Sequence, residues 1–171
     1  MPAIVSALNV KSDAFAANAA RMAEKLAQVR GLERQAVDES ASKREKFEQR
    51  GQLLPRERVA QLLDRGSGFL ELSPLAGLGM HDDDGRTSLQ GGGSIVGIGL
   101  VAGKRVVVSA SDSALKGGTV SPMGLRKMLR AQAIALENKL PLIYLVDSAG
   151  VFLTRSPSLY PDPLRLFAHQ I

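Results

Sequence analysis

The sequence contains no cysteine and no tryptophan, and aromatic residues make up only 4% of it. Without cysteine, the chain forms no disulfide, thiolate zinc site, iron–sulfur cluster or cysteine nucleophile. So few aromatic rings argue against a base-stacking surface for single-stranded nucleic acid. No apolar run approaches the roughly 20 residues of a membrane helix, and the opening MPAIVSALNV lacks the basic segment of a secretory signal. We therefore expect neither a membrane segment nor a secretory signal.

The composition is that of a globular protein with a moderate positive charge. Apolar residues make up 44% of the 171 residues, and 22 Lys plus Arg against 17 Asp plus Glu give a net charge of +5. This length suffices for one ordinary domain or for part of a larger one. The charge suits an anionic small molecule, nucleic acid, or a solvated surface without a partner, and it does not choose among them.

The first third of the chain is rich in alanine and charged residues, and we predict that it is helical from residue 12 to residue 49. Apolar side chains at spacings of three and four form one face of this helix, and they are Phe15, Ala19, Met22, Leu26 and Val29. Gly31 is a candidate stop or bend. Because the apolar face is thin, we expect the helix to lie across the rest of the protein or a partner subunit.

A second helix and a short strand are predicted next. Pro55 suits the first turn of a helix that ends in the turn-forming residues 64–68. Residues 69–72 predict a short strand. Residues 73–93 are polar, rich in glycine and without a period, which predicts a loop.

The last third carries the clearest pattern. Residues 94–112 divide into two β-rich runs around 102–104, which predicts a hairpin. Residues 121–138 begin with Ser-Pro, a typical N-cap and first helical residue, and keep an apolar helical face. The apolar run 141–147 predicts a strand in a sheet covered on both faces. The result is a β-β-α-β unit with a right-handed crossover between its last two strands.

The turn after this last strand is the first candidate site. In α/β sheets, ligands bind beyond the carboxyl ends of the strands. Ala149 and Gly150 of the tetrapeptide DSAG have little or no side chain, so their N–H groups can approach an acyl oxygen and stabilise an oxyanion. The alternative interpretation is a tight turn after a buried strand. The tetrapeptide taken alone favours this alternative.

The second candidate site lies between the hairpin and the next helix. Lys116, Gly117 and Gly118 combine accessible backbone N–H groups with a cation that can contact phosphate. The Walker pattern GxxxxGK[ST] is absent, and no GxGxxG opens a helix after a strand. The sequence therefore supports neither a P-loop nor a dinucleotide fingerprint, and pocket lining is the alternative role.

Other polar clusters give weaker signals. His81 and the three aspartates after it lack EF-hand spacing and are interpreted as a solvated loop. Ser148 has no GxSxG context and His169 lies near the end of the chain, so a Ser–His–acid triad is poorly motivated. The charges of KREKFEQR at 43–50 are interpreted as helix surface. We predict no metal site.

Taken together, these segments resemble the carboxyltransferase β subunits of biotin-dependent acyl-CoA carboxylases, in the 3-methylcrotonyl-CoA and geranyl-CoA carboxylase branch. Most of the resemblance lies in RERVAQLLDRGSGFLEL at 56–72 and in the run from KGGT at 116–119 to RAQAIALENKLPLIYLVDSAG at 130–150. SDAFAANAARMAEKLAQVR at 12–30 and the tripeptide Tyr160-Pro161-Asp162 also match. The matching stretches follow the family's order and cover nearly the whole chain.

The resemblance implies an α/β fold of the crotonase (ClpP/crotonase-like) superfamily, built from ββα units. Residues 1–68 are then an N-terminal helical region, and residues 69–171 the first, incomplete part of the N-terminal carboxyltransferase domain. The implied enzyme is a ligase that forms C–C bonds. It transfers a carboxyl group from carboxybiotin to an unsaturated branched acyl-CoA, either 3-methylcrotonyl-CoA or geranyl-CoA. We expect this stretch alone to be inactive, because the half that binds biotin is missing.

The resemblance also implies roles for individual residues. The DSAG turn matches the family's DSGG turn, which makes Ala149 and Gly150 the amides that hold the thioester oxygen. It assigns substrate binding to Lys116, Gly117, Gly118 and Val151. The chain departs from the family's pattern at Ala149, at Val151-Phe152 and at Thr154. These departures keep two alternatives open, a propionyl- or acetyl-CoA carboxylase β subunit and a non-catalytic acyl-CoA-binding homologue.

Cofactors and partners follow from the same resemblance. Biotin is expected as carboxybiotin on a separate carrier subunit, with acyl-CoA as the substrate and with ATP and Mg used by the partner biotin carboxylase. The expected partners are the biotin carboxylase/biotin carrier α subunit and further β subunits in a homo-oligomer, without nucleic acid or membrane. The expected location is the cytoplasm of a bacterium, or the mitochondrial matrix in a eukaryote.

Overall fold

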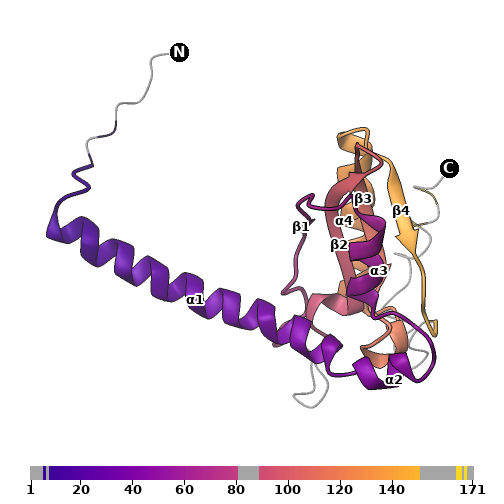
Figure 1. Cartoon of the computed structure of the whole chain (residues 1–171). Coiled ribbons are helices and arrows are strands. Elements are labelled where there is room, and N and C mark those ends of the chain that lie inside the picture. The colour runs from indigo at the N-terminus through magenta and orange to yellow at the C-terminus, as the bar shows by residue number, and fades with distance from the viewer. Residues whose placement is uncertain (1–5, 7, 81–88, 151–164, 167, 169–171) are drawn as a thin grey trace. The chain divides into compact units, whose positions relative to one another are not determined.

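The structure is a computed structural model that describes residues 6, 8–80, 89–150, 165, 166 and 168. The chain divides into two compact units, Met1–Gln35 and Ala36–Ile171. Figure 1 labels the elements. They are α1 (Asp13–Ala41), α2 (Arg44–Glu48), α3 (Pro55–Leu62), β1 (Leu70–Glu71), β2 (Ser94–Val101), β3 (Lys104–Ser111), α4 (Pro122–Glu137) and β4 (Leu142–Leu145), with short 3-10 turns at Gln90–Gly93 and Lys116–Gly118.

Helix α1 runs without a break through Gly31, so the interpretation of this glycine as a stop or bend is wrong. Isolated glycine is tolerated inside a helix at a cost of about 1 kcal/mol. The predicted helix is interrupted instead after Ala41, where the Ser42 hydroxyl donates to the Glu39 carbonyl at 2.7 Å. Such a side-chain hydrogen bond competes with the helical pattern, and α2 begins only at Arg44.

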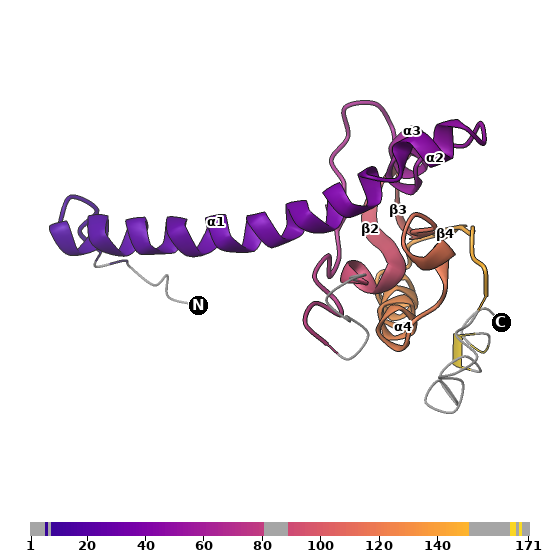
Figure 2. The ribbon, with the colours of Figure 1, turned by 90° about the horizontal axis from the view of Figure 1, so that it is seen from below.

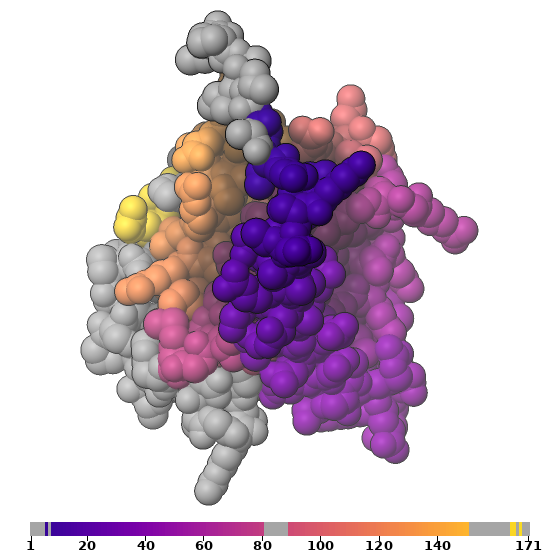
Figure 3. Space-filling model, turned by 90° about the vertical axis from the view of Figure 1, so that its left-hand side faces the viewer, coloured from indigo at the N-terminus to yellow at the C-terminus, as the bar shows by residue number. Residues whose placement is uncertain are grey.

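The first unit consists mainly of the N-terminal part of α1, whose predicted apolar face is exposed. Met22, Leu26 and Val29 are 61%, 47% and 44% exposed. Figure 3 draws the atoms of this part of the helix in indigo. The spacing of the apolar residues therefore identified the helix, and the described residues do not bury the face that it forms.

Helix α3 begins at Pro55, as predicted, and belongs to the same unit as the sheet. The Glu57 carboxylate accepts a hydrogen bond from the Leu54 backbone N–H at 3.0 Å, which satisfies one N-terminal donor. Val59 is 3% exposed because it packs against the sheet. Helix α3 and the sheet thus belong to one compact unit, Ala36–Ile171.

The sheet has the order β1-β2-β3-β4, with antiparallel β1–β2 and β2–β3 pairs and a parallel β3–β4 pair. This confirms the predicted hairpin and the β-β-α-β order. Ala102 and Gly103 both have positive φ in the hairpin turn. The Asp64 carboxylate accepts from both of their backbone N–H groups, at 2.8 and 2.7 Å. The turn after α3 thus fixes the tip of the hairpin.

Both faces of the sheet are covered, as the apolar strands predicted. On one face, Val59 of α3 packs with a buried cluster that includes Ile95 and Val108. On the other face, Val96 and Val107 pack with alanines of α4. Figure 2 shows α3 and α4 on opposite sides of the strands. The residues of β4 are only half-buried, because this strand forms one margin of the described sheet.

Helix α4 starts where the Ser-Pro signal placed it. The Ser121 hydroxyl accepts from the Gly124 N–H at 2.9 Å and donates to the Gly92 carbonyl at 3.1 Å. Gly92 and Gly124 bring the two backbones together, since a Cβ on Gly124 would stand 2.2 Å from the Gly92 oxygen. The first turn of α4 therefore lies directly against the glycine turn that precedes β2.

Candidate functional site

The two turns singled out from the sequence meet where β3 and β4 end. The Ala149 N–H donates to the Gly117 carbonyl at 2.9 Å, and the Ser148 hydroxyl donates to the Gly118 carbonyl at 2.7 Å. Gly118 has a φ of +69°, and a Cβ there would stand 2.3 Å from the Asp147 oxygen, so no other residue fits without a shift. The candidates at 116–118 and at 149–150 thus belong to one site, the turn pair.

The two amides expected to hold a thioester oxygen have acceptors inside the protein. The Ala149 N–H donates to a backbone carbonyl, that of Gly117, and the Gly150 N–H donates to the Ser148 hydroxyl at 3.1 Å. The two acceptors differ in mobility, because a hydroxyl can rotate whereas the carbonyl is fixed by the turn pair. The Gly150 amide can therefore become available if the Ser148 hydroxyl rotates away and gives up its hydrogen bond to the Gly118 carbonyl, and the Ala149 amide only if the turns separate.

Beside the turn pair lies a hollow of about 450 Å³ that we call the basic groove. Four cationic side chains line it, two of them from α2 and its N-terminal flank, and they are Lys43, Lys46, Arg50 and Lys116. The interpretation of the 43–50 charges as plain helix surface is therefore incomplete. The signal was available in the sequence, because the basic positions 43, 46 and 50 recur at helical spacing.

Asp147 is an acidic residue of the basic groove, and Arg58 lies close to it. The Arg58 guanidinium is 3.8 Å from the Asp147 carboxylate. This pairing offsets the negative charge of Asp147, the carboxylate that lines the groove. The groove therefore keeps a positive character suited to an anion.

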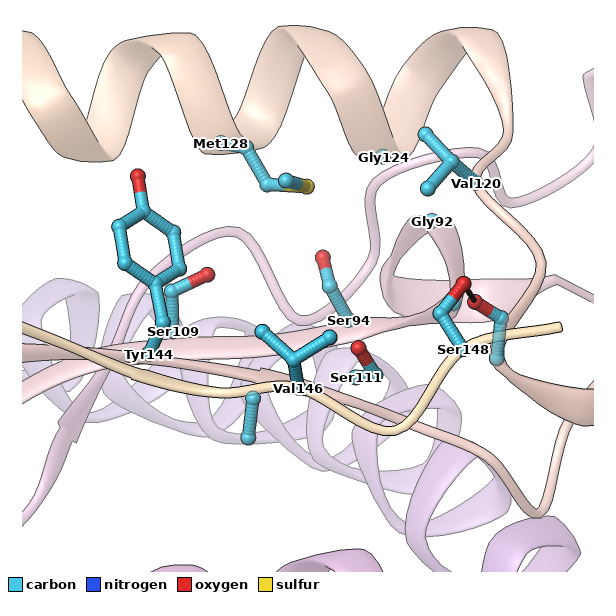
Figure 4. A pocket seen from close by; sticks show the side chains of 13 residues that line it. Gly92, Ser94, Ser109, Ser111, Val120, Gly124, Met128, Tyr144, Val146 and Ser148 are labelled. Carbon is cyan, nitrogen blue, oxygen red and sulfur yellow. Dashed lines mark hydrogen bonds between the residues drawn. The ribbon is translucent and has the colours of Figure 1, made fainter. Parts of the chain in front are cut away.

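A separate cavity of about 90 Å³ lies on the other side of the turn pair, under the first turns of α4. We call it the α4 cavity. Figure 4 shows Met128 reaching down from α4 and Tyr144 and Val146 standing up from β4 and its end. The residues that line it are Gly92, Gly93, Ser94, Ser109, Ala110, Ser111, Gly118, Val120, Gly124, Met128, Tyr144, Val146 and Ser148.

Tyr144 is held in place at one side of the α4 cavity by a buried glutamine. The Gln132 side-chain N–H₂ donates to the Tyr144 hydroxyl at 2.8 Å and to the Leu166 carbonyl at 3.0 Å. Gln132 is only 5% exposed. Because the glutamine donates, the phenol accepts this hydrogen bond and its own proton remains available as a donor.

A buried lysine stabilises the glycine turn behind the cavity. Lys127 is 6% exposed, and its ammonium group donates to the Gly91 carbonyl at 3.1 Å and to the Ser94 carbonyl at 2.7 Å. Burial disfavours the charged form, which lowers the pKa of Lys127 to about 8. The lysine thus links α4 to the start of β2.

Two further polar contacts lie around this lysine, the first buried and the second half-buried. Asp112, at the end of β3, accepts from the Ser40 hydroxyl at 2.9 Å, and burial raises the pKa of this carboxyl. Arg56 forms a bidentate pair with Glu71 at 2.7 and 3.0 Å. These contacts tie α1, α3 and β1 to the strands. They are structural, because none of the four residues lines the basic groove or the α4 cavity.

Several residues named from the sequence lie outside the described part of the chain, among them Val151, His81 and His169. Within the described part, no group of three or more His, Cys, Asp or Glu side chains could hold a metal ion. No helix described there is long and apolar enough to cross a membrane.

Comparison with known proteins decides the family. The sequence profile of the carboxyl transferase domain matches residues 46–161, which include the turn pair, the lining of the α4 cavity and all of the lining of the basic groove except Lys43. The chain belongs to the carboxyl transferase domain family. The fold agrees: the β subunit of geranyl-CoA carboxylase from Pseudomonas aeruginosa superposes with a TM-score of 0.88 at 51% identity, over 99% of this chain and 31% of that one.

Curated relatives of this carboxyl transferase chain point to the same branch of the family. The chain is 54% identical over 119 residues to the biotin-dependent 3-methylcrotonyl-coenzyme A carboxylase beta1 subunit of Mycobacterium tuberculosis, covering 70% of this chain and 22% of that protein. It is 42% identical over 169 residues to the probable mitochondrial methylcrotonoyl-CoA carboxylase beta chain of Drosophila melanogaster. That match covers 96% of this chain and 29% of the Drosophila protein. The chain therefore spans less than a third of the length of these relatives.

Proposed function

We propose that the chain forms part of a carboxyltransferase β subunit that transfers a carboxyl group from carboxybiotin to an unsaturated branched acyl-CoA. Membership of the carboxyl transferase family supports the reaction class. The names of the relatives, which act on 3-methylcrotonyl-CoA and geranyl-CoA, support the substrate class. The crotonase-type fold belongs to the same proposal, and the β-β-α-β order with a parallel β3–β4 pair supports it.

The observation that carries the proposal is the basic groove beside the turn pair. Coenzyme A carries a diphosphate and a ribose phosphate, and lysine and arginine side chains are suited to phosphate oxygens. Lys43, Lys46, Arg50 and Lys116 face this hollow, and Gly117 and Ala149 line the same hollow. A CoA held there by its phosphates has its thioester end near 148–150.

The turn pair then supplies the electrostatic part of the chemistry. Removing the proton next to the thioester carbonyl places negative charge on its oxygen, and a backbone N–H aimed at that oxygen is worth about 3 to 4 kcal/mol of barrier. In this proposal the Gly150 amide is released when the Ser148 hydroxyl rotates away, which also breaks the hydrogen bond from that hydroxyl to the Gly118 carbonyl. The Ala149 amide joins it only when the hydrogen bond to Gly117 opens, and Val151 borders the substrate.

Cofactor and partners are part of the proposal. Carboxybiotin, when bound, supplies the carboxyl group, and it is delivered by a biotin carboxylase/biotin carrier α subunit that uses ATP and Mg. Further β subunits complete the site in a homo-oligomer. Because relatives come from Mycobacterium tuberculosis and from mitochondria, the proposed location is a bacterial cytoplasm or, in a eukaryote, the mitochondrial matrix.

A binding measurement on the full-length subunit tests the basic groove. Lys46→Gln should weaken the affinity for CoA by about 3- to 10-fold, since one charge-assisted phosphate contact is lost. The matched control is Lys104→Gln, which removes an exposed lysine at the far end of the hairpin. Pantetheine, which lacks the nucleotide phosphates, should bind both variants equally. Equal CoA affinity in Lys46→Gln and the parent protein would argue against the groove.

Activity of the assembled enzyme tests the reaction. The full-length subunit with its biotin-carrying partner should consume carboxybiotin only when 3-methylcrotonyl-CoA or geranyl-CoA is present. Consumption with propionyl-CoA or acetyl-CoA alone would favour the propionyl/acetyl branch. CoA binding without turnover of any of these thioesters would point to the non-catalytic homologue instead.

A further inference from the structure

We propose that the basic groove recognises the phosphates of its ligand and not the base, so that a free nucleoside diphosphate such as ADP occupies the groove in competition with CoA. This inference rests on the proposed function, in which CoA is held in the groove by its phosphates. It adds a second class of ligand at that site. A nucleotide in the groove excludes the substrate, so free nucleotide regulates the enzyme by competition.

Two arginines near the groove already have carboxylate partners. The Arg44 guanidinium is 2.7 Å from the Glu57 carboxylate, and the Arg58 guanidinium is 3.8 Å from the Asp147 carboxylate. Three cations of the groove differ from these arginines, because no carboxylate among the described residues forms an ion pair with them, and they are Lys43, Lys46 and Arg50. Their positive charge is therefore left for an anionic ligand.

The anchoring of α2 keeps these three cations close together. Their positions follow helical spacing, and like charges at that spacing repel one another. Phe47 of the same helix is only 6% exposed, and Arg44 pairs with Glu57 of α3, so the helix is fixed at two points. A backbone that is fixed before the ligand arrives need not be ordered by it, which favours binding. An anion in the groove also relieves the repulsion between the cations.

Little in the described lining of the groove can recognise a base. Its aromatic residue is Phe47, and a ring that is 6% exposed offers no free face on which a purine stacks. A base edge has the Gln52 amide as a partner, and one such hydrogen bond adds little beside four cations. Lysine, in contrast, binds phosphate in many orientations, because its ammonium group is a compact charge on a flexible stem. The groove therefore favours phosphate whatever base is attached.

ADP is a part of the CoA molecule. The nucleotide end of CoA is an ADP with a further phosphate on its ribose, and the pantetheine arm with the thioester extends from its diphosphate. The groove, of about 450 Å³, lies within the range of roughly 300 to 1,000 Å³ that is typical of small-molecule sites. Free ADP makes phosphate contacts there and lacks the arm that reaches residues 148–150. It should therefore raise the KM for acyl-CoA in carboxyl transfer and leave kcat unchanged.

Calorimetric binding of ADP, GDP and adenosine to the full-length subunit tests the inference. ADP and GDP should bind with affinities within about 3-fold of each other, and adenosine should not bind detectably, because it has no phosphate. ADP should displace CoA and raise its apparent Kd linearly with the ADP concentration. Lys46→Gln combined with Arg50→Gln removes two cations and should weaken both ADP and CoA by about 10- to 100-fold. The matched control, Lys104→Gln combined with Lys139→Gln, changes two exposed lysines outside the lining and should alter neither affinity.

The outcomes separate this inference from the proposed function. Gln52→Ala should leave the ratio of the ADP and GDP affinities unchanged. A preference of more than about 10-fold for one base, or adenosine binding as tightly as ADP, would overturn phosphate recognition. If CoA binds and ADP does not displace it, this inference alone is overturned. If neither binds, both fail, and if ADP binds without CoA, the proposed function fails and phosphate recognition stands. Should the double variant not fold, Lys43→Gln combined with Lys46→Gln repeats the test.

Discussion

The buried Lys127 predicts an unusual dependence of stability on alkaline pH. The group has an ordinary pKa of 10.5 when unfolded and about 8 in the folded protein. Between these values the unfolded chain binds the proton and the folded chain does not, so the free energy of unfolding rises with pH in this window. This gain in the free energy of unfolding is absent below pH 8 and grows between pH 8 and pH 10.5. Above pH 10.5 it is complete and amounts to about 3 kcal/mol.

The assay is urea unfolding followed by circular dichroism at pH 7, 8, 9 and 10. The parent protein should gain about 2 to 3 kcal/mol of stability from Lys127 over this range. Lys127→Met removes the titrating group and should lose that rise, whereas Lys104→Met, which changes an exposed lysine, should keep it. A pH profile that is the same in the parent protein and in Lys127→Met would refute the reasoning.

Three further substitutions test the packing. Gly124→Ala should lower the free energy of unfolding by about 1 to 3 kcal/mol, since its Cβ would meet the Gly92 oxygen; an unchanged urea midpoint would contradict this contact. Gly31→Ala should instead add up to about 1 kcal/mol of helix stability, seen as higher helicity, because nothing lies near its Cβ position. Ser40→Ala should lower the urea midpoint at pH 7 and Asp112→Asn should not, because only the first leaves a buried carboxylate without this donor.

Local signals accounted for most of the fold. The Ser-Pro cap at 121–122, Pro55 at the start of α3 and the hairpin at 102–103 are decided by nearest neighbours, so the sequence alone located them. The break after Ala41 depended on a hydrogen bond from Ser42, which no periodicity reveals. The packing of α3 on the sheet is likewise not a local property, because Val59 contacts strands that lie far away in the sequence.

The site was harder to predict than the fold. The sequence identified both turns, because glycine and alanine stand out after an apolar strand. It did not show that the Ala149 amide pairs with Gly117, since that contact joins residues 32 positions apart. The role of Lys46 depends on where α2 comes to lie, and the α4 cavity depends on which strand residues face the helix. Such properties follow from three-dimensional packing, which a single sequence does not reveal directly.

The contact between Gly92 and Gly124 has a consequence for how related proteins diverge. Because two main chains are in contact here, the distance between the start of α4 and the glycine turn is fixed, and a larger α4 cavity would need both segments to change together. Homologues with a larger α4 cavity are therefore expected to carry a smaller side chain at the position of Met128 and to keep both glycines.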